Sequence, residues 1–378
     1  MTTSLAVGQA GPRPEEAGMV GVPGLARQRI WIISDDLSGP PDEGVKKFTH
    51  AIAVGLGAQH DVALISTHGE DAAGLAQAIP AGRHFLSRQL RAALRDGHPE
   101  YVIYATRRSA TFFSFLRARL LKLYCPGARV VLLGLQTRRH PGWQQQIIRR
   151  IRPDLVIAQS DDNCAYLAGL GCRVALTPGG VDTETFQPVD TGRRAALREQ
   201  YGLAQDRPVI LHVGHLQEGR GVRALIPLAA SGECQVVLVA SSSTAQEEQL
   251  AAELRAAGVR IVSEYLPRIE ELYQLADCYV FPVTATDNAI EAPLSVLEAL
   301  ACDLPVVMRR FGGLPRLFGR VRHPGLRFVD SDAELAARAI ELARAGTRGT
   351  RAFAMPFSWS HTSRALLAEL LDLSNDTT

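Results

Sequence analysis

The sequence predicts an α/β protein made of two Rossmann-like domains that face a cleft. Short apolar runs alternate with helical patterns from Arg29 onward, which is typical of a parallel sheet covered by helices. The alternation begins a second time near Val209, after a linker that contains Pro188 and Gly192. With 378 residues, the chain is long enough for two domains of ordinary size.

The strands that we expect are short, apolar and rich in β-branched residues. The first domain should contain strands at Ile30–Ser34, Val62–Ser66, Tyr101–Ala105, Val130–Leu133, Leu155–Ala158 and Val174–Leu176. The second domain should contain strands at Val209–Val213, Val236–Ala240, Val259–Val262, Cys278–Pro282 and Val306–Met308. Ligands of such folds bind beyond the carboxyl ends of the strands, so the loops there should carry the chemistry.

Four segments follow from this pattern. Residues 1–28 are rich in Gly, Pro and Ala, lack the features of a signal peptide and should form a flexible tail. We expect an N-terminal domain over 29–188, a C-terminal domain over 189–356 and a terminal helix over 357–378. This helix, with Trp359 near its start, is amphipathic and should pack back towards the N-terminal domain.

Composition excludes several classes of function. The net charge of +2 provides no global field for nucleic acid. The six cysteines are scattered, with neither a CxxC pair nor the spacing of a zinc site, and we expect free thiols in a reducing cytoplasm. No apolar run approaches the roughly 20 residues of a spanning helix. We therefore predict a cytoplasmic protein without a metal or cofactor.

The segment between Asn288 and Pro315 holds an unusual combination of residues. Glu298 lies inside an apolar helical run, and a buried helix tolerates a charge badly unless a ligand or partner receives it. A short strand follows, and then Gly312-Gly313, a turn that brings backbone N–H groups close to a neighbour, typically an anion. This pattern favours a ligand site.

The segment resembles the nucleotide-sugar site of GT-B glycosyltransferases, most closely the retaining GT4 family (glycosyl transferases group 1). The matching residues, in order, are Glu298, Ala299, Pro305, Val306, Val307, Gly312, Gly313 and Pro315. Gly180–Phe186 matches a second family motif between the domains, where Asp182 can cap a turn and Phe186 can fill an apolar gap. The resemblance implies a GT-B fold, retention of anomeric configuration and no dedicated metal site.

The resemblance also implies a set of donor-binding residues. In the loop after Val209–Val213, Gly214 and Gly221 match, His215 replaces the family Arg, and Arg220 replaces the Lys that holds the diphosphate. A guanidinium remains charged and presents a fork suited to phosphate oxygens. The alternative for His215 is a purely structural role in the fold. The alternative for Arg220 is that it is an ordinary residue of a solvated loop.

Two carboxylates have further roles in that family. Glu298 would accept hydrogen bonds from the ribose hydroxyls, because a carboxylate offers two acceptor oxygens to a vicinal diol. Glu291 lies seven positions before Glu298, where the family spacing is eight, and strict alignment places Ile290 there instead. A shortened loop that still presents Glu291 to the donor sugar is the interpretation that we favour, since Asp287 and Asn288 crowd the same loop. A site that has lost this contact is the alternative.

The N-terminal domain should bind the acceptor, with Gly44 in the first loop close to the reacting centre. The family His after Val130–Leu133 is missing, and the nearest imidazole is His140. Arginines interleaved with aromatic residues over residues 107–152 could hold a phosphorylated acceptor or an anionic bilayer. Solvated helix faces are the interpretation that we favour, so membrane contact is a lesser alternative.

The resemblance thus predicts a glycosyltransferase that moves a sugar from a UDP-, GDP- or dTDP-type donor to an acceptor. Glu291, Arg220 and Gly44 are the expected catalytic residues. The alternatives are a non-catalytic GT-B protein that binds a nucleotide sugar or a partner, and a GT-B sugar-nucleotide epimerase.

Overall fold

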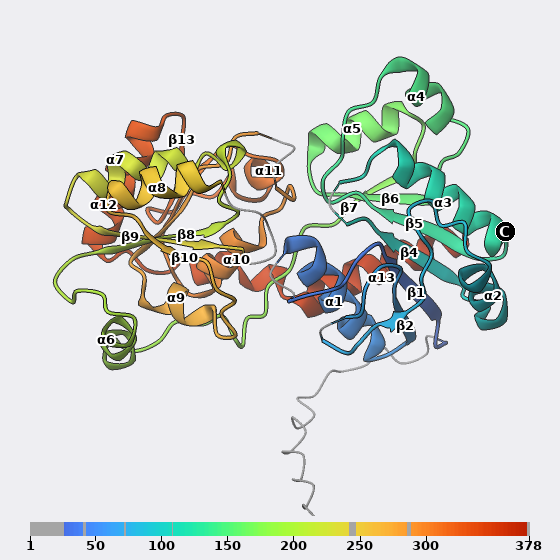
Figure 1. Cartoon of the computed structure of the whole chain (residues 1–378), viewed down its shortest axis with the longest axis horizontal. Helices are drawn as coiled ribbons and strands as arrows, with labels where there is room; N and C mark the ends of the chain where they lie inside the picture. The colour runs from blue at the N-terminus through green and yellow to red at the C-terminus, as the bar shows by residue number, and fades with distance from the viewer. Residues whose placement is uncertain are drawn as a thin grey trace, which may run out of the picture.

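The structure of the chain is a computed structural model that describes residues 26–40, 43–71, 73–107, 109–241, 247–285 and 289–375. The expected N-terminal tail lies almost wholly outside these residues, as do Asp287 and Asn288. Two parallel sheets with helices on their faces lie side by side (Figure 1). The predicted α/β class with two Rossmann-like domains is confirmed, and its arrangement is that of the GT-B fold.

The N-terminal sheet has seven strands in the order β3-β2-β1-β4-β5-β6-β7. Its elements are β1 (Arg29–Ser34), α1 (Gly44–Gly57), β2 (Asp61–Ser66), β3 (Gln77–Ala78), α2 (Arg88–Gly97), β4 (Tyr101–Ala105), α3 (Phe112–Tyr124), β5 (Arg129–Leu133), α4 (Gly142–Ile148), β6 (Leu155–Ala158), α5 (Asp161–Gly169) and β7 (Val174–Leu176). The sequence did not predict β3, because its two residues are exposed and show no apolar pattern.

The C-terminal sheet has six strands in the order β10-β9-β8-β11-β12-β13. Its elements are α6 (Thr191–Gln200), β8 (Val209–Gly214), α7 (Leu225–Ala230), β9 (Gln235–Ala240), α8 (Glu248–Ala256), β10 (Arg260–Val262), α9 (Glu270–Leu275), β11 (Cys278–Phe281), α10 (Leu294–Ala301), β12 (Val306–Arg309), α11 (Leu314–Phe318), β13 (Leu326–Val329) and α12 (Asp332–Ala345). The sequence missed β13, whose apolar run is interrupted by Arg327.

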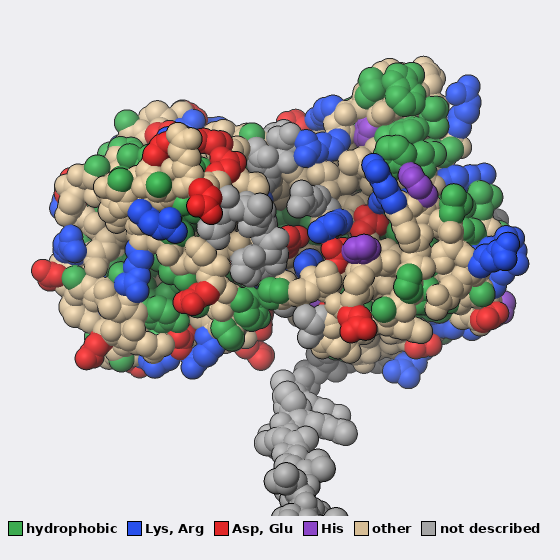
Figure 2. Space-filling view, viewed as in Figure 1, with side chains coloured by type: hydrophobic (Ala, Val, Ile, Leu, Met, Phe, Trp, Pro, Cys, Tyr) green, Lys and Arg blue, Asp and Glu red, His purple; other side chains and the backbone are tan. Residues whose placement is uncertain are grey.

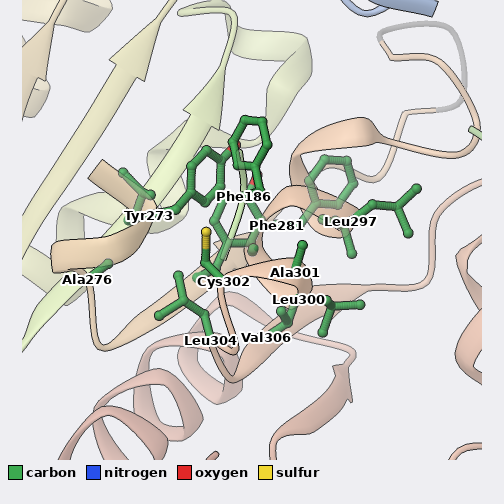
Figure 3. Packing of buried hydrophobic residues seen from close by; sticks show 14 of the residues in the cluster. Phe186, Tyr273, Ala276, Phe281, Leu297, Leu300, Ala301, Cys302, Leu304 and Val306 are labelled. Atoms are coloured by element: carbon green, nitrogen blue, oxygen red, sulfur yellow. The ribbon is translucent and has the colours of Figure 1, made fainter. Parts of the chain in front are cut away.

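Each sheet is packed on both faces by buried apolar side chains, as parallel sheets require. In the C-terminal core, Phe186 of the interdomain segment packs edge-on against Tyr273, with ring centroids 5.5 Å apart (Figure 3). Asp182 accepts hydrogen bonds from the backbone N–H groups of Glu184 and Thr185, at 3.0 and 3.1 Å. As the sequence predicted, Phe186 fills an apolar gap and Asp182 caps a turn.

The last helix, α13 (Trp359–Asn375), returns to the N-terminal domain and packs beside α1 (Figure 1). Trp359 contacts Phe48 of α1 edge-on, with ring centroids 5.7 Å apart. Gly180 lies against the same indole, and a Cβ at Gly180 would be 2.4 Å from Trp359 Cε3. The interdomain segment and the crossover helix therefore meet at one tightly packed point. No helix among the described residues is long and apolar enough to cross a membrane.

Candidate functional site between the two domains

A cavity of about 360 Å³ lies between the domains, within the range of small-molecule sites. It opens at the carboxyl ends of strands from both sheets, where loops leave β1, β4 and β5 on one side and β8, β9 and β11 on the other. Among the residues lining it are Glu43, Gly44, Lys47, Arg107, Ser109, Gln136, Arg138, Gly214, His215, Arg220, Ser241, Glu264, Ile290, Leu294, Ser295 and Glu298.

Arg220 presents a desolvated cation to this cavity. It ends the 3-10 turn η1 (Glu218–Arg220), and its Nε is buried without a hydrogen-bond partner in the described part of the chain. Burial lowers the pKa of Arg220 to about 10, against the opposing influence of Tyr279 and Glu43, so the side chain remains charged at neutral pH. A half-buried cation that forms no ion pair within 4 Å among the described residues, and that Glu43 influences only from a distance, is suited to receive an anionic ligand.

The two glycines predicted for this loop permit close packing, but only Gly214 of β8 lines the cavity, whereas Gly221 directly follows η1 and packs on protein backbone. A Cβ at Gly221, whose φ is +65°, would lie 2.5 Å from the carbonyl oxygen of Pro282. A Cβ at Gly214 would lie 2.9 Å from Nε2 of His212. Burial lowers the pKa of His212 to about 4, so the ring is neutral and its Nδ1–H donates to the carbonyl of Val280 at 2.9 Å.

Glu298 of α10 faces the cavity and already has two partners. Its Oε2 accepts a hydrogen bond from Tyr273 at 2.7 Å, and its Oε1 pairs with Nζ of Lys47 at 2.8 Å. Burial and the adjacent carboxylate hold the pKa of Tyr273 well above its usual value, so the phenol remains a donor. Lys47 belongs to the other domain, and the sequence analysis did not single it out. The only available signal was a polar position between the core residues Val45 and Phe48.

Glu291 lies at the domain interface and, unlike its neighbour Ile290, does not line the cavity. Its carboxylate is 3% exposed and accepts hydrogen bonds from Ser160 Oγ at 2.6 Å and from Asn163 Nδ2 of α5. Burial raises the pKa of Glu291, and these two donors counteract the increase. The loop therefore presents Ile290 to the cavity, the position that alignment at the family spacing of eight selects.

The Gly312-Gly313 turn packs on the same loop. Gly312 has a φ of +48°, and a Cβ there would lie 2.5 Å from the carbonyl oxygen of Glu291. The N–H of Gly313 donates to that oxygen at 2.7 Å, and a Cβ at Gly313 would lie 2.1 Å from the carbonyl oxygen of Gln159. The turn thus approaches protein backbone closely, and it positions the Glu291 loop against the N-terminal domain.

Two helices direct their N-termini at the cavity. Gly44 begins α1, and a Cβ there would lie 2.9 Å from Ile290 Cδ1, so the two domains touch at this point. Leu294 and Ser295 begin α10 on the opposite wall. The first N–H groups of a helix lack intrahelical partners and carry partial positive charge. With Arg220, these N-termini make a suitable environment for a diphosphate.

The N-terminal wall contains polar residues that sequence reasoning did not assign individually to the site. Arg107 pairs with Asp36 at 3.3 Å, and Arg138 donates to Ser109 at 3.3 Å. Both arginines line the cavity. His140 does not line it: burial lowers the pKa of its imidazole, and Nδ1 bonds to the hydroxyl of Tyr166 at 2.8 Å.

Comparison with known proteins finds a family model that matches most of the C-terminal domain. Residues 193–347 match the model for glycosyl transferases group 1. A D-inositol 3-phosphate glycosyltransferase of Mycolicibacterium paratuberculosis is 29% identical over 60% of this chain and 54% of its own length. An alpha-maltose-1-phosphate synthase of Mycolicibacterium smegmatis is 28% identical over 52% of this chain and 56% of its own. The chain thus spans about half the length of these relatives.

Solved structures agree in fold. A sucrose-phosphate synthase from Thermosynechococcus elongatus superimposes with a TM-score of 0.72 at 18% identity, covering 93% of this chain and all of its own. HepE of Anabaena, in complex with UDP-glucose, superimposes with a TM-score of 0.68 at 18% identity, covering 91% and 99%. This chain therefore has the GT-B fold, and residues 193–347 of its C-terminal domain match the glycosyl transferases group 1 family.

Proposed function

We propose that this protein is a glycosyltransferase that binds a nucleotide-diphosphate sugar in the cavity and transfers the sugar to an acceptor held by the N-terminal domain. The main support is the buried, unpartnered Nε of Arg220 in a cavity between the domains, on a C-terminal domain that matches the group 1 family. A related D-inositol 3-phosphate glycosyltransferase, and the structure of HepE with UDP-glucose, agree with this class of reaction and donor.

The donor would lie with its diphosphate beside Arg220 and the N-termini of α1 and α10. Gly214 would let the backbone approach it, Gly221 would let the Arg220 turn pack on Pro282, and His215 would add a hydrogen bond. The ribose diol would bind Glu298 by replacing the ammonium of Lys47 on Oε1, while Tyr273 holds Oε2. If one of the two ribose hydroxyls takes the place of the ammonium, the number of donors to the carboxylate is conserved, and the second hydroxyl can add a further hydrogen bond.

Transfer would depend on stabilising the negative charge that develops on the leaving diphosphate. Arg220 and the helix N-termini are fixed before the reaction, so they need no reorganisation when the charge appears. Gly44 and Ile290 would bound the sugar at the domain junction. Glu291, with Gly312 and Gly313, would hold this loop in place through Ser160 and Asn163. The resemblance to a retaining family is the reason to propose retention of anomeric configuration.

The test is to incubate the purified protein with a panel of UDP-, GDP- and dTDP-sugars. Calorimetry would report binding, and NMR would report turnover and the anomeric configuration of the product or of the slowly hydrolysed donor. Binding with turnover supports the proposal. Tight binding without turnover on any acceptor would favour the non-catalytic alternative, and conversion to an epimeric nucleotide sugar would favour the epimerase.

Glu298→Gln provides the site-specific test, because it keeps the shape of the side chain but removes its charge. It should weaken donor binding by roughly tenfold or more. Glu271→Gln is the matched control: Glu271 is also buried in the C-terminal domain and accepts from Tyr201 at 2.9 Å and Arg193 at 2.8 Å, away from the cavity. Unchanged donor affinity in Glu298→Gln would contradict the assignment of this carboxylate.

A further inference from the structure

A patch of exposed apolar side chains covers the outer side of the N-terminal domain, on α3, α4 and the loop before α2. It consists of the exposed side chains of Leu86, Phe113, Leu116, Leu123 and Trp143 and of the partly exposed Leu120. Figure 2 shows hydrophobic side chains gathered over α3 and α4, with Lys and Arg side chains around them. Trp143 is 62% exposed, Leu86 76% and Leu123 55%. Side chains of this size rarely gather on a surface that contacts only water.

The patch follows the geometry of one helix. Positions 113, 116, 120 and 123 of α3 are separated by three, four and three residues, so they form one stripe along the helix. The opposite stripe, with Phe115, Ala118 and Leu121, is fully buried against the sheet. This helix is therefore apolar on its outward side as well as on its inward side.

Aromatic contacts and a groove join the stripe to neighbouring elements. The Phe112 ring lies 5.5 Å from Trp143 of α4 and 5.9 Å from Phe113, centroid to centroid. A groove of about 320 Å³ runs between the stripe and Leu86. Arg117 of α3 donates to the carbonyl of Arg83 at 2.9 and 2.7 Å, which links α3 to the loop before α2. The exposed surface is thus continuous and held in place.

The charge of this region is strongly one-sided. Residues 101–153, which contain α3 and α4, carry eleven basic residues (ten Arg and one Lys) and no Asp or Glu. Among the described residues, four of the eleven pair with carboxylates outside this segment, namely Arg107 with Asp36, Arg117 with Asp35, and Lys122 and Arg129 with Asp154. The whole chain has a net charge of +2, so the remainder carries 2 − 11 = −9. Arg119, which lines the groove, and Arg149, directly after α4, are exposed. A partner for this surface should therefore be anionic.

We infer that the patch docks the protein on the surface of an anionic bilayer. An apolar helical stripe with an interfacial Trp, surrounded by Arg, is the combination that inserts at the boundary of headgroups and acyl chains. A second copy of the chain fits less well, because a symmetric contact would oppose two basic surfaces. An acidic protein would satisfy the charge, but the aliphatic residues Leu116, Leu120 and Leu123 match acyl chains directly.

Docking would bring the cavity to the membrane surface. The loop from β4 to α3 supplies Arg107 and Ser109 to the cavity wall, and the loop from β5 to α4 supplies Gln136 and Arg138. The segments that begin the two docking helices therefore also border the cavity. The docking itself does not depend on glycosyl transfer, so the two proposals can fail separately.

The test is vesicle flotation of the full chain. One set of vesicles is phosphatidylcholine alone, and in the other about a third of the lipid is phosphatidylglycerol. We expect the protein to float with the anionic vesicles at low salt, with binding that decreases as salt rises. A protein that remains unbound to both sets, or that binds them equally, would overturn the proposal.

Matched variants locate the surface. Leu116→Gln with Leu123→Gln should weaken anionic-vesicle binding by roughly tenfold or more, since two apolar side chains no longer enter the bilayer. Val54→Gln, at a site on α1 that is 61% exposed, should bind as the wild type does. Arg119→Glu should also weaken binding, whereas Arg255→Glu on the C-terminal domain should not. Unchanged binding of the double variant would contradict the assignment.

Sedimentation velocity tests whether a second copy of the chain, rather than a bilayer, covers the patch. We expect no dimer at micromolar concentrations in the wild type. If the wild type forms a dimer and the Leu116→Gln, Leu123→Gln double variant is monomeric, a second copy of the chain covers the patch. That result would overturn the bilayer assignment. All these substitutions are at exposed or partly exposed side chains, so the fold should persist, and circular dichroism checks this.

Discussion

Lys47 of the N-terminal domain and Glu298 of the C-terminal domain form an ion pair across the cavity, with Nζ and Oε1 2.8 Å apart. The ammonium is 26% exposed and the carboxylate 6%. The pair therefore joins the two domains at the carboxylate that we assign to ribose binding. Under this assignment, the ribose of a donor would replace this contact.

Removal of Lys47 should loosen the domain junction. Lys47→Met leaves the buried Glu298 with Tyr273 as its partner among the described residues, and should reduce the free energy of unfolding by about 1–2 kcal/mol, after allowance for partial solvent screening. Urea unfolding measures this. Arg338→Met, which breaks an exposed pair with Glu341, is the control and should change little. Equal stability of Lys47→Met and the wild type would show that the pair contributes nothing to the junction.

Arg220 should reduce stability in the free protein while it supports donor binding. Arg220→Met removes a desolvated cation and should raise the free energy of unfolding by about 1 kcal/mol, yet weaken donor binding by roughly tenfold or more. Arg194, whose pKa burial also lowers to about 10, pairs with Asp277 away from the cavity. Arg194→Met should therefore destabilise the protein and leave donor affinity unchanged. Thermal unfolding and calorimetry on both variants distinguish a ligand-binding Arg from a structural one.

Glu291 should make stability depend on pH in a predictable direction. Burial raises its pKa in the folded state above the ordinary value of 4.5, so the native state holds the proton more tightly. The stability from this group is fully present below pH 4.5 and is lost as pH rises through the folded pKa. Glu291→Gln should remove this loss, and so gain stability relative to the wild type as pH increases.

Urea unfolding across pH 4 to 8 tests this expectation. Glu199→Gln, at an exposed site of α6, is the control and should show no such trend. A stability difference between Glu291→Gln and the wild type that stays constant with pH would contradict the direction given for Glu291.

Gly312 should tolerate no side chain. Gly312→Ala combines a positive φ with a Cβ 2.5 Å from the carbonyl oxygen of Glu291, and should cost about 2–3 kcal/mol. Gly346→Ala has a φ of +59° with nothing within 4 Å of its Cβ, so it should cost only about 1 kcal/mol of backbone strain. Chemical unfolding of both variants separates the clash from the strain, and equal losses would mean that the turn relaxes away from Glu291.

Much of the fold was predictable because its signals are local. The apolar runs placed β1, β8 and β11 nearly to the residue, since a strand buried on both faces needs a continuous apolar segment. Asp182 and Phe186 were also predictable, because a cap requires only its own turn and an aromatic plug requires only an apolar surrounding. The short strands β3 and β13 carry no such signal and were missed.

By itself, the sequence determined the two α/β domains, the crossover helix and the positions of the acids and glycines of the candidate site. Only the tertiary structure decided what those acids contact. Glu298 and Lys47 are 251 residues apart, and Glu291 and Asn163 are 128 apart. Whether a carboxylate faces a cavity or a neighbouring domain depends on how the domains pack, and no local pattern encodes this. The tertiary packing therefore placed Ile290 in the cavity and Glu291 at the interface.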